Sequence, residues 1–112
     1  MRPRLLFTLL FLALPLAASN FDDSFVEKTM RVDYFHTSTP RGDEIVALDR
    51  VVSDGPWPGS RTRLIDTSNL GKYYFEVVDR ETNQPLYSRG FASVYGEWET
   101  TPDVKERAAT FH

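Results

Sequence analysis

Residues 72–80 read KYYFEVVDR and give the clearest strand signal in the chain. Their side chains alternate between two faces, with Tyr73, Phe75 and Val77 on one and Tyr74, Glu76 and Val78 on the other. This two-residue period is typical of a half-buried β-strand. We expect residues 86–95 to return as its antiparallel partner. Gly90 and Gly96 interrupt that partner, which indicates a bulge or a close backbone approach.

Other segments repeat the alternating pattern. Residues 28–36 place Arg31 and Asp33 on an expected wet face and leave a dry face that consists of Met30, Val32, Tyr34 and His36. Residues 44–53 are rich in β-branched side chains and predict a second strand. The remaining expectations are a loop at 37–43, a rigid loop at 54–60, a short strand at 61–66, extended chain at 97–101 and a turn of helix within 102–109.

Several short strands without a sustained helical period define the expected fold class. The sequence predicts an all-β protein, an antiparallel, jelly-roll-like β-sandwich that is incomplete at its C-terminus and preceded by a signal-peptide helix. A chain of 112 residues has room for one domain, and we assign it to residues 20–112. No internal repeat or second domain is expected.

The first nineteen residues resemble an export signal rather than part of the domain. Arg2 and Arg4 precede the apolar run 5–18, and the small residues 17–19 follow. A charged start, an apolar stretch and a small-residue cleavage zone are typical of a secretory signal peptide. The run is shorter than the roughly 20 residues that span a bilayer. We therefore expect a secreted or periplasmic protein with residues 1–19 removed and no permanent membrane span.

Composition and motifs argue against catalysis by this chain. It contains no cysteine, its net charge is −3, and His36 and His112 are its only histidines. A zinc peptidase needs closely spaced histidines, and nucleic-acid binding usually needs a clustered basic face. We therefore assign no catalytic, cofactor-binding or metal-binding residue and expect no nucleic-acid partner. The carboxylates mostly indicate solvated faces and turn caps, although Glu97 and Glu99, flanking Trp98 on an extended segment, could form a calcium or sugar site.

The loop Asp54–Ser60 contains two prolines and two glycines around Trp57. Because proline lacks an amide donor and glycine favours special torsions, this segment cannot be regular structure. Two interpretations of Trp57 remain open: the ring folds back to cap the core, or it forms an exposed platform for a sugar or a protein partner.

Four segments together resemble a known family: FDDSFVEKTMRVDYFHT at 21–37, VVSDGPWPGSRTRLID at 51–66, LGKYYFEVVDR at 70–80 and YSRGFASVYGEWETT at 87–101. They are similar to the N-terminal domain of the secreted bacterial IgA peptidases, the zinc metallopeptidase family sixty-four. The resemblance implies a β-sandwich ahead of a separate zinc-dependent catalytic domain. It also implies that the zinc and the catalytic residues lie in that other domain. The chain stops at residues 110–112, before the further strands of the family, and either a truncated reading frame or a stand-alone module explains this.

The resemblance implies an accessory, non-enzymatic role. The expected partners are the catalytic peptidase domain, against which this domain packs or which it positions, and a glycoprotein substrate. Trp57, Arg61 and Arg63 are the expected contact residues, because tryptophan and arginine concentrate binding energy at interfaces. The alternative is a small secreted carbohydrate-binding module in which Trp57, Trp98 and nearby tyrosines stack on sugar rings.

Overall fold

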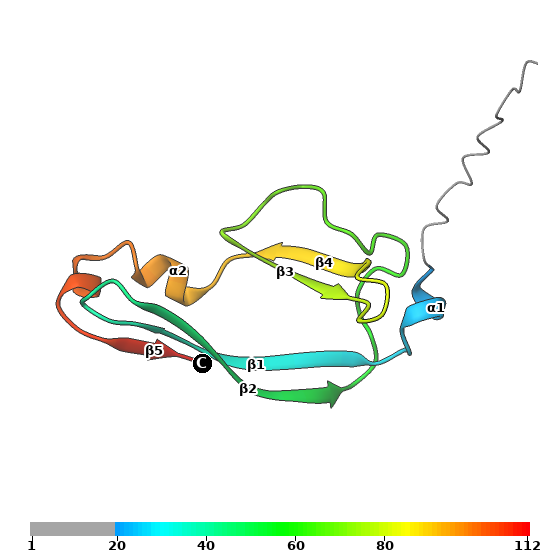
Figure 1. Cartoon of the computed structure of the whole chain (residues 1–112), viewed down its shortest axis with the longest axis horizontal. Coiled ribbons are helices and arrows are strands. Elements are labelled where there is room, and N and C mark those ends of the chain that lie inside the picture. Colours follow the sequence, from blue (N-terminus) through cyan, green and yellow to red (C-terminus); the bar gives the residue numbers. More distant parts are fainter. Residues whose placement is uncertain (1–19) are drawn as a thin grey trace, which may run out of the picture.

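The computed structural model describes residues 20–112 and shows two antiparallel sheets (Figure 1). The expected signal peptide, residues 1–19, lies outside the described residues. The elements in chain order are α1 (Phe21–Ser24), β1 (Thr29–Ser38), β2 (Glu44–Asp54), β3 (Tyr73–Val78), β4 (Pro85–Phe91), α2 (Val94–Trp98), the 3-10 helix η1 (Pro102–Lys105) and β5 (Ala109–Phe111). Five strands and short helices confirm the predicted all-β, sandwich-like class.

The larger sheet has the order β2-β1-β5, so β1 is its central strand. The β1–β2 hairpin pairs from Thr29 opposite Asp54 to Ser38 opposite Glu44, with a bulge at Asp49, which has no partner on β1. Its turn is closed by the Thr39 amide, which donates to the Asp43 carbonyl over 3.1 Å. The strand therefore continues two residues into the segment 37–43 that the sequence predicts as loop. The C-terminal strand β5 pairs with the other edge of β1, from His36 to Ser38.

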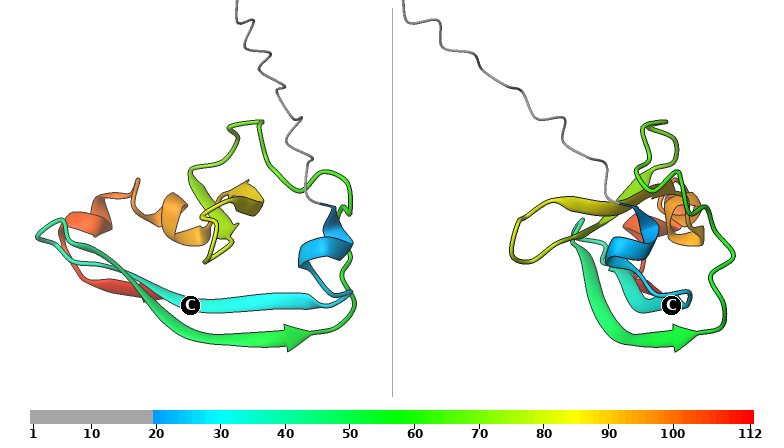
Figure 2. Two further views of the ribbon diagram at one scale, coloured as in Figure 1. Left: turned by 45° about the vertical axis from the view of Figure 1, so that its right-hand side comes forward. Right: turned by 90° about the vertical axis from the view of Figure 1, so that its right-hand side faces the viewer.

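The second sheet is the β3–β4 hairpin that the 72–80 segment predicts. Its turn is built on Asp79, whose carboxylate accepts the amides of Glu81 and Thr82 over 2.8 and 2.9 Å. The two hairpins lie in separate layers, with α1 near one end and α2 with η1 near the other (Figures 1 and 2). Strand β4 ends at Phe91 rather than at Tyr95.

The prediction of a strand at 61–66 is wrong. The segment lies beside β4, but hydrogen bonds from side chains replace most of the main-chain hydrogen bonds that a paired strand would form. The Ser88 amide donates to the Leu64 carbonyl over 2.9 Å, which is the main-chain bond between the segments. The Asp66 amide instead donates to the Ser88 hydroxyl over 2.9 Å, and the Arg89 guanidinium donates to the carbonyls of Arg63 and Leu64 over 2.6 and 3.0 Å.

The prediction of extended chain at 97–101 is also wrong, because helix α2 spans Val94–Trp98. Ser93 caps this helix, and its hydroxyl accepts the Gly96 amide over 3.3 Å. The following residues continue as turns until η1 begins at Pro102, which confirms the predicted turn of helix. A serine at the N-cap satisfies an amide that would otherwise lack a partner, so it can start a helix in an aromatic segment that favours strands.

Aromatic rings line the space between the two layers. A continuous series of ring contacts, with centroids 3.4 to 6.1 Å apart, links the two ends of the molecule. The series runs through Trp57, Tyr87, Phe75, Phe91, Tyr73, His36 and Tyr95. His36 is buried on the same face as Tyr34, as the alternation at 28–36 predicts. The ring of Tyr95 stacks on the imidazole of His36 at 3.4 Å and also contacts Trp98 and Phe111.

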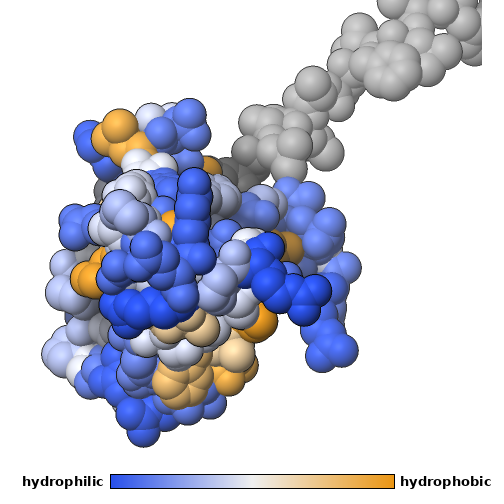
Figure 3. All heavy atoms as spheres, turned by 90° about the vertical axis from the view of Figure 1, so that its left-hand side faces the viewer, coloured by the Kyte–Doolittle hydropathy of each residue, from blue (hydrophilic) through white to orange (hydrophobic). Residues whose placement is uncertain are grey.

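The core is small, because the buried apolar side chains among residues 20–112 are those of Phe21, Leu64 and Tyr95. Many large apolar side chains remain exposed, including Met30 and Val32 from the predicted dry face. Figure 3 shows apolar residues reaching the surface between hydrophilic side chains. The alternation at 28–36 thus identifies the inner face correctly, but the second layer covers only part of it.

Candidate functional site

Trp57 lies at the end of the sandwich near α1. Its ring stacks on Phe21 at 6.4 Å and meets Tyr87 edge-on at 5.5 Å. The indole Nε1 donates to the Ser60 carbonyl over 3.2 Å, which fixes the ring within its own loop. The side chain is half-buried. Trp57 therefore caps the core end, as the first of its two interpretations predicts, while part of the ring remains accessible.

The two arginines of the expected contact surface have different surroundings. Arg61 forms an ion pair with Glu27, and its guanidinium lies 5.2 Å from the centre of the Phe21 ring. Arg63 is exposed, and its backbone amide donates to the Ser60 hydroxyl over 2.8 Å. The structure thus brings Trp57 and Arg61 together around Phe21 and places Arg63 beyond the same loop.

Phe21 and Phe25 complete this region, and the sequence reasoning missed both of them. They belong to α1 and its C-cap, and their rings are 5.5 Å apart. The Asn20 amide donates to the Asp23 carboxylate over 3.2 Å at the start of this helix. An Asn followed three residues later by an acidic side chain is a helix-start signal that could have indicated α1.

An apolar cavity of about 140 Å³ opens beside Trp57. It is lined by Phe21, Phe25, Lys28, Met30, Trp57, Phe75, Val77 and Tyr87. Sugar and cofactor sites combine aromatic rings with several converging polar groups. Lys28 is the one charged side chain in this lining, so the cavity is better suited to an apolar side chain of a protein than to a sugar.

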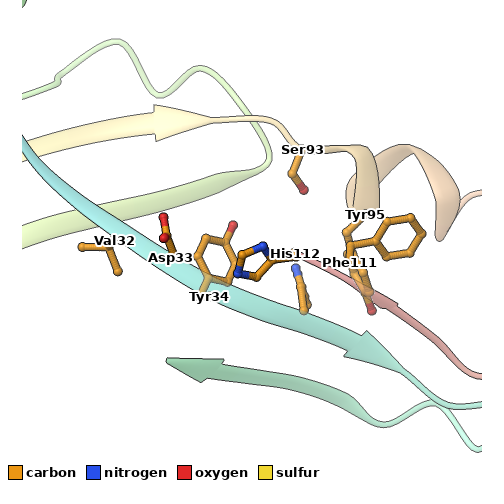
Figure 4. A pocket seen from close by; sticks show the side chains of 8 residues that line it. Val32, Asp33, Tyr34, Ser93, Tyr95, Phe111 and His112 are labelled. Atoms are coloured by element: carbon orange, nitrogen blue, oxygen red, sulfur yellow. The ribbon is translucent and has the colours of Figure 1, made fainter. Parts of the chain in front are cut away.

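A second, more polar cleft of about 280 Å³ lies between β1, β5 and the start of α2 (Figure 4). It is lined by Val32, Asp33, Tyr34, His36, Ser93, Tyr95, Phe111 and His112. The two histidines are held by carboxylates: His36 Nε2 lies 2.7 Å from Glu44 Oε1, and His112 Nε2 lies 3.0 Å from Asp49 Oδ2.

The groups of this cleft do not form a catalytic arrangement. The Ser93 hydroxyl caps α2, and its described hydrogen bond is to the Gly96 amide rather than to a histidine. Nucleophilic catalysis needs a hydroxyl within hydrogen-bond reach of its base. Across residues 20–112, no three histidine or acidic side chains are grouped closely enough to hold a metal ion.

Glu97 and Glu99 do not form the calcium or sugar site that their spacing suggests, because helix α2 turns them apart. Glu99 forms an ion pair with Lys72 and accepts the Tyr73 hydroxyl over 3.0 Å. Lys72 lowers the pKa of Glu99, while burial, followed by the bond to Glu99, raises the pKa of Tyr73 to about 12. This network joins the start of β3 to α2.

Asp66 is the centre of the hydrogen bonds that attach the irregular segment to β4. Its carboxylate accepts the Ser68 hydroxyl over 2.6 Å, the Gly90 amide over 2.7 Å and the Ser68 amide over 2.8 Å. These bonds stabilise the charged form and lower the pKa of Asp66 from 3.8 to about 2.

Replacing Asp66 with Asn is expected to lower the stability at neutral pH. Because the pKa of Asp66 is lower in the folded state, its contribution is present above about pH 4 and is lost as the pH falls toward 2. The difference in melting temperature between wild type and Asp66→Asn should therefore shrink over that range. Asp22→Asn, at an exposed position of α1, is the control and should leave the melting temperature nearly unchanged. A pH-independent difference for Asp66→Asn would contradict the assignment.

The fold and the sites define a class: a small β-rich domain that exposes large apolar side chains. Residues 20–112 match the family model described as peptidase M64 N-terminus, and the chain belongs to that family. A search of curated proteins finds no match. Residues 20–112 are thus an N-terminal domain of the M64 peptidase family, and the family implies a catalytic domain as its partner. No helix among the described residues is long and apolar enough to cross a membrane.

Proposed function

We propose that this chain is an accessory domain that packs against the peptidase domain of an M64-family enzyme and positions it. The family match supports this proposal, because an N-terminal domain of a peptidase family implies a catalytic domain as its partner. The zinc and the catalytic residues belong to that peptidase domain. The proposal includes secretion after removal of residues 1–19, a full-length enzyme of the IgA-peptidase type and contact with a glycoprotein substrate.

The uncovered inner face of the β1–β2 hairpin is the observation that carries the proposal. Pairing places Val32 opposite Val51 and Tyr34 opposite Leu48 on this face. We define the inner stripe by its exposed apolar members, which are Met30, Val32, Val46, Leu48 and Val51. Contiguous exposed apolar surface marks interaction sites, and a core this small gains stability when a partner covers it.

The inner stripe is continuous with the apolar cavity beside Trp57, because Met30 belongs to both. Trp57 lines the cavity, and Arg61 lies over Phe21 in the same lining. The proposed contact residues Trp57, Arg61 and Arg63 would therefore form one end of the docking surface. An apolar side chain of the peptidase domain would fill the cavity, since buried anchors in pockets dominate interface energies.

Replacing Val32 with Lys is expected to weaken binding to an M64 peptidase domain supplied in trans by at least tenfold. Val32 is 47% exposed, so its substitution removes little from the domain itself but places a charge in the proposed interface. Alanine at Trp57, Arg61 and Arg63 together should weaken binding as well. Titration calorimetry against the peptidase domain measures both effects.

The matched control is Ile45→Lys, on the same hairpin. Ile45 is 51% exposed but pairs with Thr37 and so lies on the outer face. The Ile45→Lys variant should bind the peptidase domain as tightly as the wild type does. The proposal fails if the wild-type chain does not bind the peptidase domain, or if the two lysine variants lose affinity equally.

A further inference from the structure

Strand β2 is an edge strand with an open side. It pairs with β1 on one side, and its other side has no strand partner among the described residues. The strand is eleven residues long, contains neither proline nor glycine, and is exposed at every position except the half-buried Val52. A long edge strand of this kind can act as a template for pairing with another chain.

The centre of β2 carries an opposite pair of charges at neighbouring positions. Asp49 and Arg50 divide the strand into two similar halves, EIVAL before them and VVSD after them. If two copies of β2 pair antiparallel about the midpoint of this dipeptide, Asp49 faces Arg50 of the partner subunit, and Arg50 faces the partner's Asp49. Cross-strand pairs of opposite charge stabilise a sheet, whereas like charges directly opposite destabilise it. This register therefore contains two favourable charge pairs and no like-charge pair.

The bulge in β2 makes that register compatible with the two faces of the sheet. In a regular strand Leu48 and Val51 would lie on opposite faces, because their separation is odd. Here the pairing with β1 skips Asp49, so Leu48 and Val51 both lie on the inner face, opposite Tyr34 and Val32. The two-fold pairing then sets Leu48 against the partner's Val51, and these residues are 66% and 55% exposed in the single chain.

Both central charges are able to reach a second copy. Arg50 donates to the Asp33 carboxylate through Nε over 2.8 Å, and its side chain is 61% exposed. A guanidinium has five N–H donors, so Arg50 can hold Asp33 and the partner's Asp49 together. Asp49 accepts His112 through one oxygen and is also partly exposed.

We propose that this chain associates with a second copy through antiparallel pairing of β2, centred between Asp49 and Arg50. The two three-stranded sheets then form one continuous six-stranded sheet. The dimer is made by main-chain pairing along the strand edge, with Leu48 and Val51 of the inner stripe beside it, whereas the proposed peptidase contact is the open face of that stripe and the apolar cavity beside Trp57. The dimer therefore does not depend on the proposed function.

Charge reversal in separate copies tests the pairing. The chain is expressed from its full 112-residue sequence, and its mass in solution is measured by sedimentation velocity across a range of concentrations. We expect the wild type to dimerise. Asp49→Arg sets arginine against arginine and Arg50→Asp sets aspartate against aspartate, so each variant alone should dimerise at least tenfold more weakly. An equimolar mixture of the two variants should form a heterodimer, because every central pair is then Arg with Asp.

A second measurement protects the test against a variant that fails to fold. Amide hydrogen exchange of β2 in the wild type should slow as the concentration rises, while the exchange of β3 and β4 should stay constant. A wild-type chain that is monomeric throughout, or a mixture that associates no better than its components, would overturn the proposal. Loss of the dimer with retained binding to the peptidase domain separates this inference from the proposed function.

Discussion

Replacing Gly90 with alanine is expected to lower the free energy of unfolding by about 3 kcal/mol. A Cβ at this position would overlap the carbonyl oxygen of Leu70 and lie 3.1 Å from its carbonyl carbon. Because the obstacle is backbone, it cannot move aside as a flexible side chain would. The shift would also disturb the bond from the Gly90 amide to Asp66, which attaches the irregular segment to β4. Urea denaturation of the two chains measures the difference.

Gly96→Ala is the matched control for that substitution. The nearest atom to its added Cβ is the ring carbon Cε2 of Tyr73 at 3.2 Å, and a ring can shift by a few tenths of an ångström. Gly96 also lies in α2, where alanine is favoured over glycine by up to about 1 kcal/mol. Its stability should therefore change by less than about 1 kcal/mol. Equal losses for the two variants would show that the backbone contact at Gly90 is not the cause.

The strands that the sequence predicts well are those in which local pattern and final environment agree. Alternation at 28–36 and 72–80 is strong, and both segments are strands whose inward side chains meet the other layer. The same pattern cannot show that the second layer has only two strands, so it does not predict that Met30 and Val32 remain exposed. How much of a strand's inner face is buried depends on the size of the opposing layer and cannot be read from the strand's own sequence.

The two wrong strand predictions have different physical causes. At 61–66 the backbone is held by Ser88 and Arg89, more than twenty residues away, instead of a regular ladder. At 94–98 the aromatic and β-branched composition favours a strand, and a five-residue helix is too short to show a helical period. Ser93 was the local signal for that helix, and it is informative only when read as an N-cap.

The candidate site was predicted in part. The composition of the 54–60 loop indicates a fixed, irregular path, and Trp57 does pack against the core end. Phe21 and Glu27 contact Trp57 and Arg61, but this could not be inferred from sequence, because more than twenty-five residues separate Phe21 and Glu27 from the loop. The contact role of Trp57, Arg61 and Arg63 stays a prediction.

Replacing Tyr95 with alanine is expected to lower the free energy of unfolding by about 3 to 5 kcal/mol, as for other buried aromatic side chains. Tyr95 is 3% exposed and joins three elements, because its ring contacts those of His36, Trp98 and Phe111. The other buried apolar side chains among residues 20–112 are those of Phe21 and Leu64, so the loss of this ring removes a large share of the core. Urea denaturation followed by near-ultraviolet circular dichroism measures the loss.

Tyr95→Phe keeps the ring and is the control, and it should cost less than about 1 kcal/mol. A loss below about 1 kcal/mol for Tyr95→Ala would contradict the central place of this ring in the core. The same variant also bears on the proposed partner. Binding to the folded state alone adds to its stability, so a saturating M64 peptidase domain should raise the melting temperature of Tyr95→Ala. The peptidase domain should not raise the melting temperature of the double variant Val32→Lys/Tyr95→Ala. This result would show that the stabilisation comes from contact with the inner stripe and not from a general effect of added protein.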